Sequence, residues 1–64
     1  MKVNGKDFVL KNTQSLSEFL DANDYNINRI VVELNGKIIS KNEYCTINLN
    51  NTDVMEVLTF VGGG

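Results

Sequence analysis

Short stretches of alternating apolar and polar residues, separated by two Asn-Gly pairs, dominate the chain. Asn-Gly is the strongest short signal of a β-hairpin, because a type I′ turn needs positive φ at both central positions. Asn4-Gly5 and Asn35-Gly36 each lie between such stretches, so we predict two hairpins. The predicted strand pairs are residues 1–3 with 6–10, and residues 30–34 with 37–39.

A two-residue turn also determines which side chains share a face of each hairpin. The predicted buried faces comprise Met1, Val3, Phe8 and Leu10 in the first hairpin, and Ile30, Val32, Leu34 and Ile39 in the second. The predicted outward face of the second hairpin comprises Val31, Glu33 and Ile38.

A short helix is predicted between the two hairpins. Ser15 and Glu18 have the capping-box spacing that begins a helix, and Asn23-Asp24 is expected to end it after about two to three turns. The apolar stripe of this helix consists of Leu16, Phe19 and Leu20 at positions i, i+3 and i+4. Because a helix this short is unstable alone, we expect it to pack on the sheet.

Residues 40–51 are polar and irregular, and residues 50–53 are predicted to form a tight turn. The apolar side chains expected to pack from this segment onto the core are Tyr44, Ile47 and Leu49. Cys45 is interpreted as a small, half-buried loop residue rather than a sulfur or redox site.

Residues 54–61 are predicted to form the last strand, with Met55 and Val57 facing the helix. Alternation places the other face of this strand in solvent, and its residues are Val54, Glu56, Leu58 and Phe60. We predict that Leu58 and Phe60, joined by Val31, form an exposed apolar surface that binds partner proteins. The alternative is a bulge near residue 59 that turns Phe60 back into the core.

The order of hairpin, helix, hairpin, loop and strand predicts an α+β fold, in which one helix covers one face of a mixed sheet of about five strands. The 64 residues allow one domain. A chain of this length buries only about 60% of its unfolded surface, so no large internal substrate pocket is expected. We predict one domain over residues 1–64, with residues 62–64 as a flexible tail.

Composition excludes several function classes. The chain has no histidine and one cysteine, so a Ser-His-Asp triad, an internal disulfide and a Cys/His zinc site are excluded, and no metal site is predicted. The net charge of −2 argues against nucleic-acid binding. No signal-peptide pattern or membrane-length apolar run occurs, and we expect a cytoplasmic protein that is monomeric when free.

The tail Gly62-Gly63-Gly64 suggests chemistry performed on the chain by a partner enzyme. Glycines are costly to order and form a side-chain-free thread. Such a thread can enter a narrow channel and present the carboxylate of Gly64. This carboxylate can attack the α-phosphate of ATP, and the acyl-adenylate is unhindered because glycine lacks a Cβ atom. The alternative is an inert, frayed terminus.

With these features the whole chain resembles the ThiS/MoaD family of sulfur carrier proteins, which have the ubiquitin-like β-grasp fold. The residues that carry the resemblance are 3–6, 30–39 and 57–64. The last two glycines of the family, its functional residues, match Gly63 and Gly64, and Gly62 is additional. Ser40 and Thr52 depart from the proline and glycine that the family often has in two turns.

The resemblance implies a cycle of sulfur transfer in thiamine biosynthesis. An ATP-dependent ThiF-like adenylyltransferase would activate Gly64, a cysteine desulfurase relay would convert it to a thiocarboxylate, and a ThiG-like thiazole synthase would accept the sulfur. The chain would bind no cofactor stably, because ATP and the sulfur donor are used by the activating enzyme. The alternatives are a MoaD-like subunit of molybdopterin synthase, a ubiquitin-like modifier of lysines, and an interaction module with inert glycines.

Overall fold

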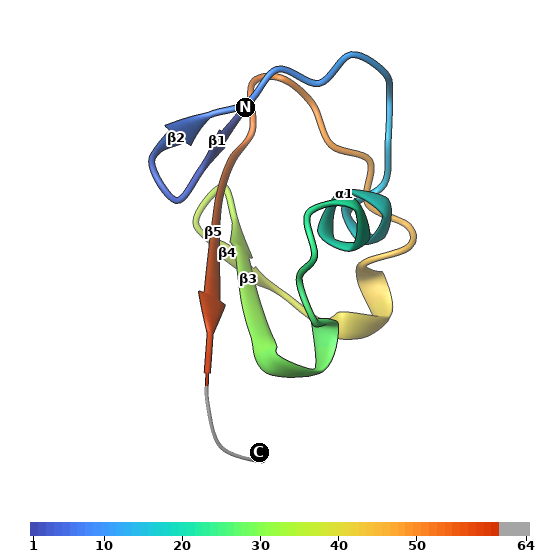
Figure 1. Ribbon diagram of the computed structural model, residues 1–64, viewed down its shortest axis with the longest axis vertical. Coiled ribbons are helices and arrows are strands. Elements are labelled where there is room, and N and C mark those ends of the chain that lie inside the picture. Colours follow the sequence, from blue (N-terminus) through green and yellow to red (C-terminus); the bar gives the residue numbers. More distant parts are fainter. Residues whose placement is uncertain (61–64) are drawn as a thin grey trace.

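The computed structural model describes residues 1–60, which form a five-stranded mixed sheet with helix α1 on one face (Figure 1). The strands are β1 Lys2–Val3, β2 Lys6–Asp7, β3 Ile30–Leu34, β4 Lys37–Ile39 and β5 Val54–Thr59. The helical segments are α1 Leu16–Ala22 and the 3₁₀ turns η1 Ile27–Arg29 and η2 Lys41–Glu43. This arrangement confirms the predicted α+β class. No helix within residues 1–60 is long and apolar enough to cross a membrane.

Both hairpins form around their Asn-Gly turns with the predicted register. Asn4 and Asn35 have φ of 51° and 53°, and the glycine after each has φ of 83°. The paired residues are Lys2 with Asp7 and Val3 with Lys6 in the first hairpin, and Val32 with Ile39, Glu33 with Ile38 and Leu34 with Lys37 in the second.

Strand β2 is shorter than the predicted strand over residues 6–10. Met1 and Phe8 still exchange two hydrogen bonds, of 2.8 Å from the terminal amino group of Met1 and 2.7 Å from the backbone N–H of Phe8. The pairing then ends, because the backbone of Leu10 bonds to the side chain of Asn51 instead of to another strand. Phe8 and Leu10 are nevertheless half-buried against the core, as predicted.

Strand β5 lies at the centre of the sheet, in the order β2-β1-β5-β3-β4 (Figure 1). It runs parallel to β1 and antiparallel to β3, with Met55 between Val3 on one side and Leu34 on the other. The inner face of the sheet is buried against α1, and the fully buried side chains include Met55 and Val32. The start of β5 is therefore held between two strands, whereas its C-terminal end pairs with β3 alone.

Two asparagines of the hairpin turns extend the hydrogen-bonded ladders of β5 beyond the strands that flank it. The side chain of Asn4 accepts a hydrogen bond from the backbone N–H of Val57 (2.8 Å) and donates one to its carbonyl oxygen (3.2 Å). Asn35 Oδ1 accepts from the N–H of Val54 (2.9 Å), and Asn35 Nδ2 donates to the carboxylate of Asp53 (3.0 Å). We call these contacts the asparagine clamps of β5.

The capping box that begins α1 is formed as predicted. Ser15 Oγ accepts from the N–H of Glu18 (3.1 Å), and Glu18 Oε1 accepts from the N–H of Ser15 (2.9 Å). The hydrogen bond from the Ser15 backbone, followed by the side-chain hydrogen bond with Ser15, lowers the pKa of the Glu18 carboxyl. The helix ends at Asn23, whose side chain donates to the carbonyl oxygen of Phe19 (2.9 Å).

The core lies between α1 and the inner face of the sheet. Its buried residues are Met1, Val3, Leu16, Phe19, Leu20, Ile30, Val32, Ile39, Tyr44, Leu49, Met55 and Val57. The rings of Phe8 and Phe19 meet edge to face at 5.7 Å, and burial raises the pKa of Tyr44. The predicted half-burial of Cys45 was wrong: this loop residue is exposed, because the neighbouring Tyr44 takes the buried position in the core.

The asparagine clamps predict a stability effect that is separate from the turn conformation. Glycine tolerates the positive φ of residue 4, so Asn4→Gly keeps the turn and removes both side-chain hydrogen bonds to Val57. We expect the free energy of unfolding in urea to fall by about 1–2 kcal/mol. Asn12→Gly, in an exposed loop, is the matched control for the greater flexibility of glycine in the unfolded chain. Equal losses in the two variants would contradict a role for the clamp.

The capping box predicts an acid-dependent part of the stability. Because the pKa of Glu18 is lower in the folded state than in the unfolded state, its carboxylate stabilises the fold at pH values above the unfolded pKa. This stabilisation is lost as the pH falls through the folded pKa. Ser15→Ala should lower the free energy of unfolding by about 1 kcal/mol at neutral pH. The difference in the free energy of unfolding between Glu18→Gln and the native chain should become smaller as the pH falls. A difference that is constant from pH 7 to pH 3, measured by urea titration, would contradict this account.

Candidate functional site

The outer face of the sheet, opposite α1, carries an exposed apolar surface. Val31 on β3 is the register partner of Leu58 on β5, and Phe60 follows two residues farther along the same face. Their exposed fractions are 37% for Val31, 61% for Leu58 and 40% for Phe60. We call these three residues the outer patch. The sequence predicted this grouping, and the structure brings all three to one face.

Phe60 lies on the outer face and not in the core. The backbone N–H of Phe60 donates to the carbonyl oxygen of Arg29 at 2.9 Å, so pairing with the segment before β3 continues beyond Thr59. Burial alternates from Val54 to Leu58, and although Thr59 is exposed as well, the register with β3 stays regular up to the pair of Ile30 with Thr59. The bulge that would have returned Phe60 to the core does not occur.

Two further apolar residues on this face were assigned no role from the sequence. Ile38 on β4 is 69% exposed, and Val54 at the start of β5 is 52% exposed. Alternation had placed both side chains outward, so the signal was present. The sequence did not show that Ile38 and Val54 belong to the same surface, because this depends on the strand order, in which β4 lies beside β3 and β3 beside β5.

Glutamates occupy the middle of the outer face. Glu33 on β3 and Glu56 on β5 are register partners, and Ile38 is the partner of Glu33 on its other side. Glu56 is exposed and Glu33 is half-buried. The outer patch therefore continues into a pair of adjacent carboxylates within the same sheet face.

The predicted reactive tail, Gly62, Gly63 and Gly64, lies outside the described residues. What the structure describes is the strand that leads to it. The central strand β5 finishes beside the first residue of β3, at the end of the sheet where η1 leads into β3 (Figure 1). The last described residue, Phe60, is held there by its hydrogen bond to Arg29.

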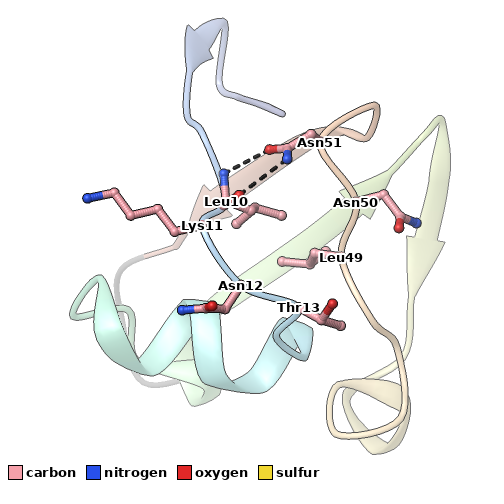
Figure 2. Close-up of a pocket in the computed structure, with 7 residues that line it drawn as sticks. All are labelled: Leu10, Lys11, Asn12, Thr13, Leu49, Asn50 and Asn51. Atoms are coloured by element: carbon pink, nitrogen blue, oxygen red, sulfur yellow. Dashed lines mark hydrogen bonds between the residues drawn. The ribbon is translucent and has the colours of Figure 1, made fainter.

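One hollow on the described surface contains no residue of the outer patch. It has a volume of about 260 Å³ and is lined by two loops, residues 10–13 and 49–51. Figure 2 shows that the side chain of Asn51 bonds across it to the backbone of Leu10, with distances of 2.8 and 3.2 Å. These contacts join two loops and bring no ionisable pair together, so they indicate a structural role.

The described residues offer no metal-binding cluster. Within residues 1–60, no three His, Cys, Asp or Glu side chains lie where they would hold a metal ion. The buried carboxylate, Asp53, is instead committed to the turn before β5: it accepts from Asn35 Nδ2 (3.0 Å) and from the backbone N–H of Asn50 (2.8 Å). What the described residues do present is an exposed apolar surface that includes the end of β5.

Comparison with known proteins gives consistent matches over the whole chain. The model of the ThiS family matches residues 1–64. An uncharacterized protein ycf40 of Trieres chinensis is 36% identical over 62 residues, which cover 97% of this chain and 85% of that protein. The sulfur carrier protein ThiS of Bacillus subtilis (strain 168) is 35% identical, and the match covers 100% of this chain and 98% of that protein.

Solved structures agree with these matches. The crystal structure of the thiamine biosynthesis protein (ThiS) from Geobacter metallireducens superimposes with a TM-score of 0.81 at 29% sequence identity, and the match covers 98% of this chain and 96% of that one. This likeness confirms the expected ubiquitin-like β-grasp fold. Because the family model and the structural match both extend over essentially the whole chain, this chain belongs to the ThiS family.

Proposed function

We propose that this chain is a sulfur carrier in thiamine biosynthesis and that the carboxylate of Gly64 is its reactive group. The observation that carries the proposal is the match to the ThiS family, which runs through Gly63 and Gly64. Support comes from two relatives, a sulfur carrier protein of Bacillus subtilis and a thiamine biosynthesis protein of Geobacter metallireducens. The chain is the substrate of partner enzymes and not itself an enzyme.

The first step of the proposed cycle activates the carboxylate. One oxygen of the Gly64 carboxylate attacks the α-phosphorus of ATP within a ThiF-like adenylyltransferase. The bond from this phosphorus to the β-phosphate bridging oxygen breaks, and pyrophosphate leaves. The resulting acyl-adenylate has a good leaving group at a carbon that no Cβ substituent shields.

The second step exchanges oxygen for sulfur. The terminal sulfur of a persulfide on the desulfurase relay attacks the acyl carbon, and AMP leaves. A second thiol then cleaves the sulfur–sulfur bond, which gives the thiocarboxylate of Gly64 and a disulfide on the relay. Transfer of the sulfur to the substrate bound by thiazole synthase, with an oxygen from that substrate or from water taking its place on the acyl carbon, regenerates the carboxylate.

The fold suits a tail that works inside a partner enzyme. Phe60 is tied to the sheet through Arg29, and four residues follow it. A fully extended chain spans at most about 3.3–3.6 Å per residue, so Gly64 can act at most about 14 Å from the sheet edge. A partner whose active site takes up Gly64 therefore also lies within contact of the outer patch.

The outer patch is the proposed docking surface for these enzymes. Val31, Leu58 and Phe60 expose apolar side chains immediately before the tail. Apolar residues grouped on a protein surface commonly mark interaction sites. Docking there would position the tail without requiring the glycines themselves to supply binding energy.

The proposed tail chemistry predicts a defined mass change. Incubation of the chain with ATP, the activating enzyme and a sulfur source should raise its intact mass by the difference between sulfur and oxygen. Deletion of Gly64 should abolish the gain, because the shortened tail no longer places a carboxylate at the reacting position. Gly62→Ala, outside the two-glycine motif of the family, should keep it.

Absence of the mass gain, or the same gain after deletion of Gly64, would contradict the proposal. The loaded chain also tests the acceptor. Sulfur delivery to thiazole synthase supports the thiamine assignment, whereas delivery only to molybdopterin synthase, or ligation to lysines of other proteins, would replace it.

The docking surface predicts a binding defect without loss of stability. Leu58→Ser removes an exposed side chain, so the thermal midpoint should change little, while the Kd for the activating enzyme should rise about tenfold. Val9→Ser, at an apolar residue outside the patch that is more exposed than Leu58, is the matched control. Equal Kd values for both variants in calorimetric titrations would show that the patch is not the docking surface.

A further inference from the structure

Glu33 and Glu56 form an unfavourable pair at the centre of the outer face. They are direct register partners on adjacent antiparallel strands, so their side chains project from the same face. Like charges placed directly opposite each other in a sheet are destabilising. The half-burial of Glu33 adds to the cost, because burial weakens hydration of its charge.

The side chains around this pair on the sheet are mainly apolar, with the basic Lys2 nearby on β1. Ile38 is the neighbour of Glu33 within the same row. The next row toward the C-terminal end of β5 holds Val31 and Leu58. One row back along β5 lies Val54, whose register partner is Lys2 on β1. Two adjacent carboxylates thus lie within the apolar surface, where charged groups are normally depleted unless they meet an opposite charge in a complex.

We propose that the outer face docks onto a protein surface that inserts a basic side chain, an arginine by its chemistry, between Glu33 and Glu56. A guanidinium group is planar and offers five donors, so one group can serve two neighbouring carboxylates. It is also weakly hydrated and packs well against apolar neighbours such as Leu58. The inference rests on the proposed function, which makes the activating enzyme the partner.

The same charges argue against a second copy of this chain as the occupant. Two outer faces packed together would bring four carboxylates into one interface. Self-association through this face is therefore disfavoured. A partner surface with a basic residue is favoured instead, because its positive charge attracts both Glu33 and Glu56 and offsets the repulsion between them.

The test compares Glu33→Gln, Glu56→Gln and the double variant in calorimetric titrations with the activating enzyme. Each single substitution should raise the Kd at least tenfold. In the double variant the Kd should rise by less than the product of the two single factors, because one basic group serves both carboxylates. Asp21→Asn on α1, on the other face of the sheet, is the matched control for net charge and should bind within twofold of the native chain.

Two readouts separate docking from folding and from tail chemistry. The thermal midpoints of the glutamine variants should equal or exceed that of the native chain, because like-charge repulsion is removed. ATP–pyrophosphate exchange should need a higher concentration of the glutamine variants to reach its half-maximal rate, whereas Asp21→Asn should match the native chain, because the tail is intact in all of them. The inference would be overturned if both single variants bound with Kd values within twofold of the native one, or if the native chain formed dimers through this face. Either result would leave the proposed function supported, provided that the native chain is adenylated. Failure of the native chain to be adenylated would instead remove the proposed function.

Discussion

The central position of β5 is the constraint on which the rest of the structure depends. This strand is the last along the chain, yet it lies between β1 and β3 and pairs with both. Because it runs parallel to β1, the connection between the two has to cross the sheet, and α1 with the second hairpin forms that crossover. Asn4 and Asn35 then extend both ladders, so the turns that reverse the hairpins also hold β5.

This arrangement divides β5 between two tasks. Its inward residues, Met55 and Val57, complete the core against α1. Its outward residues carry the apolar patch and one carboxylate of the glutamate pair. Since alternate residues of a strand face opposite sides, the outer face can change chemically with little effect on core packing. A domain of this size has a small margin of stability, and this separation keeps the unfavourable placement of Glu33 opposite Glu56 apart from the core.

Features encoded by neighbouring residues were predictable from the sequence. Each Asn-Gly turn determined the register of its own hairpin, and Ser15 with Glu18 marked the start of α1. The position of β5 between β1 and β3 was not predictable, because it depends on contacts such as that of Asn4 with Val57, which are 53 residues apart. The early end of β2 has a similar cause, since Leu10 bonds to Asn51. Exposure of Cys45 was missed because the direction of a side chain in an irregular turn follows its neighbours' packing and not a sequence period.

The glutamate pair and the outer patch together address a problem that any carrier has. A carrier has to be recognised by one enzyme, released, and recognised by the next, so very tight binding would hinder its turnover. A patch of three apolar side chains gives limited affinity, and charge complementarity contributes more to association rate and specificity than to affinity. Placing Glu33 and Glu56 beside the patch thus favours rapid, selective encounters that still dissociate. The proposed reactive carboxylate, four residues beyond Phe60, can then be the same for every partner. On this account selectivity resides in the sheet face and reactivity in the tail.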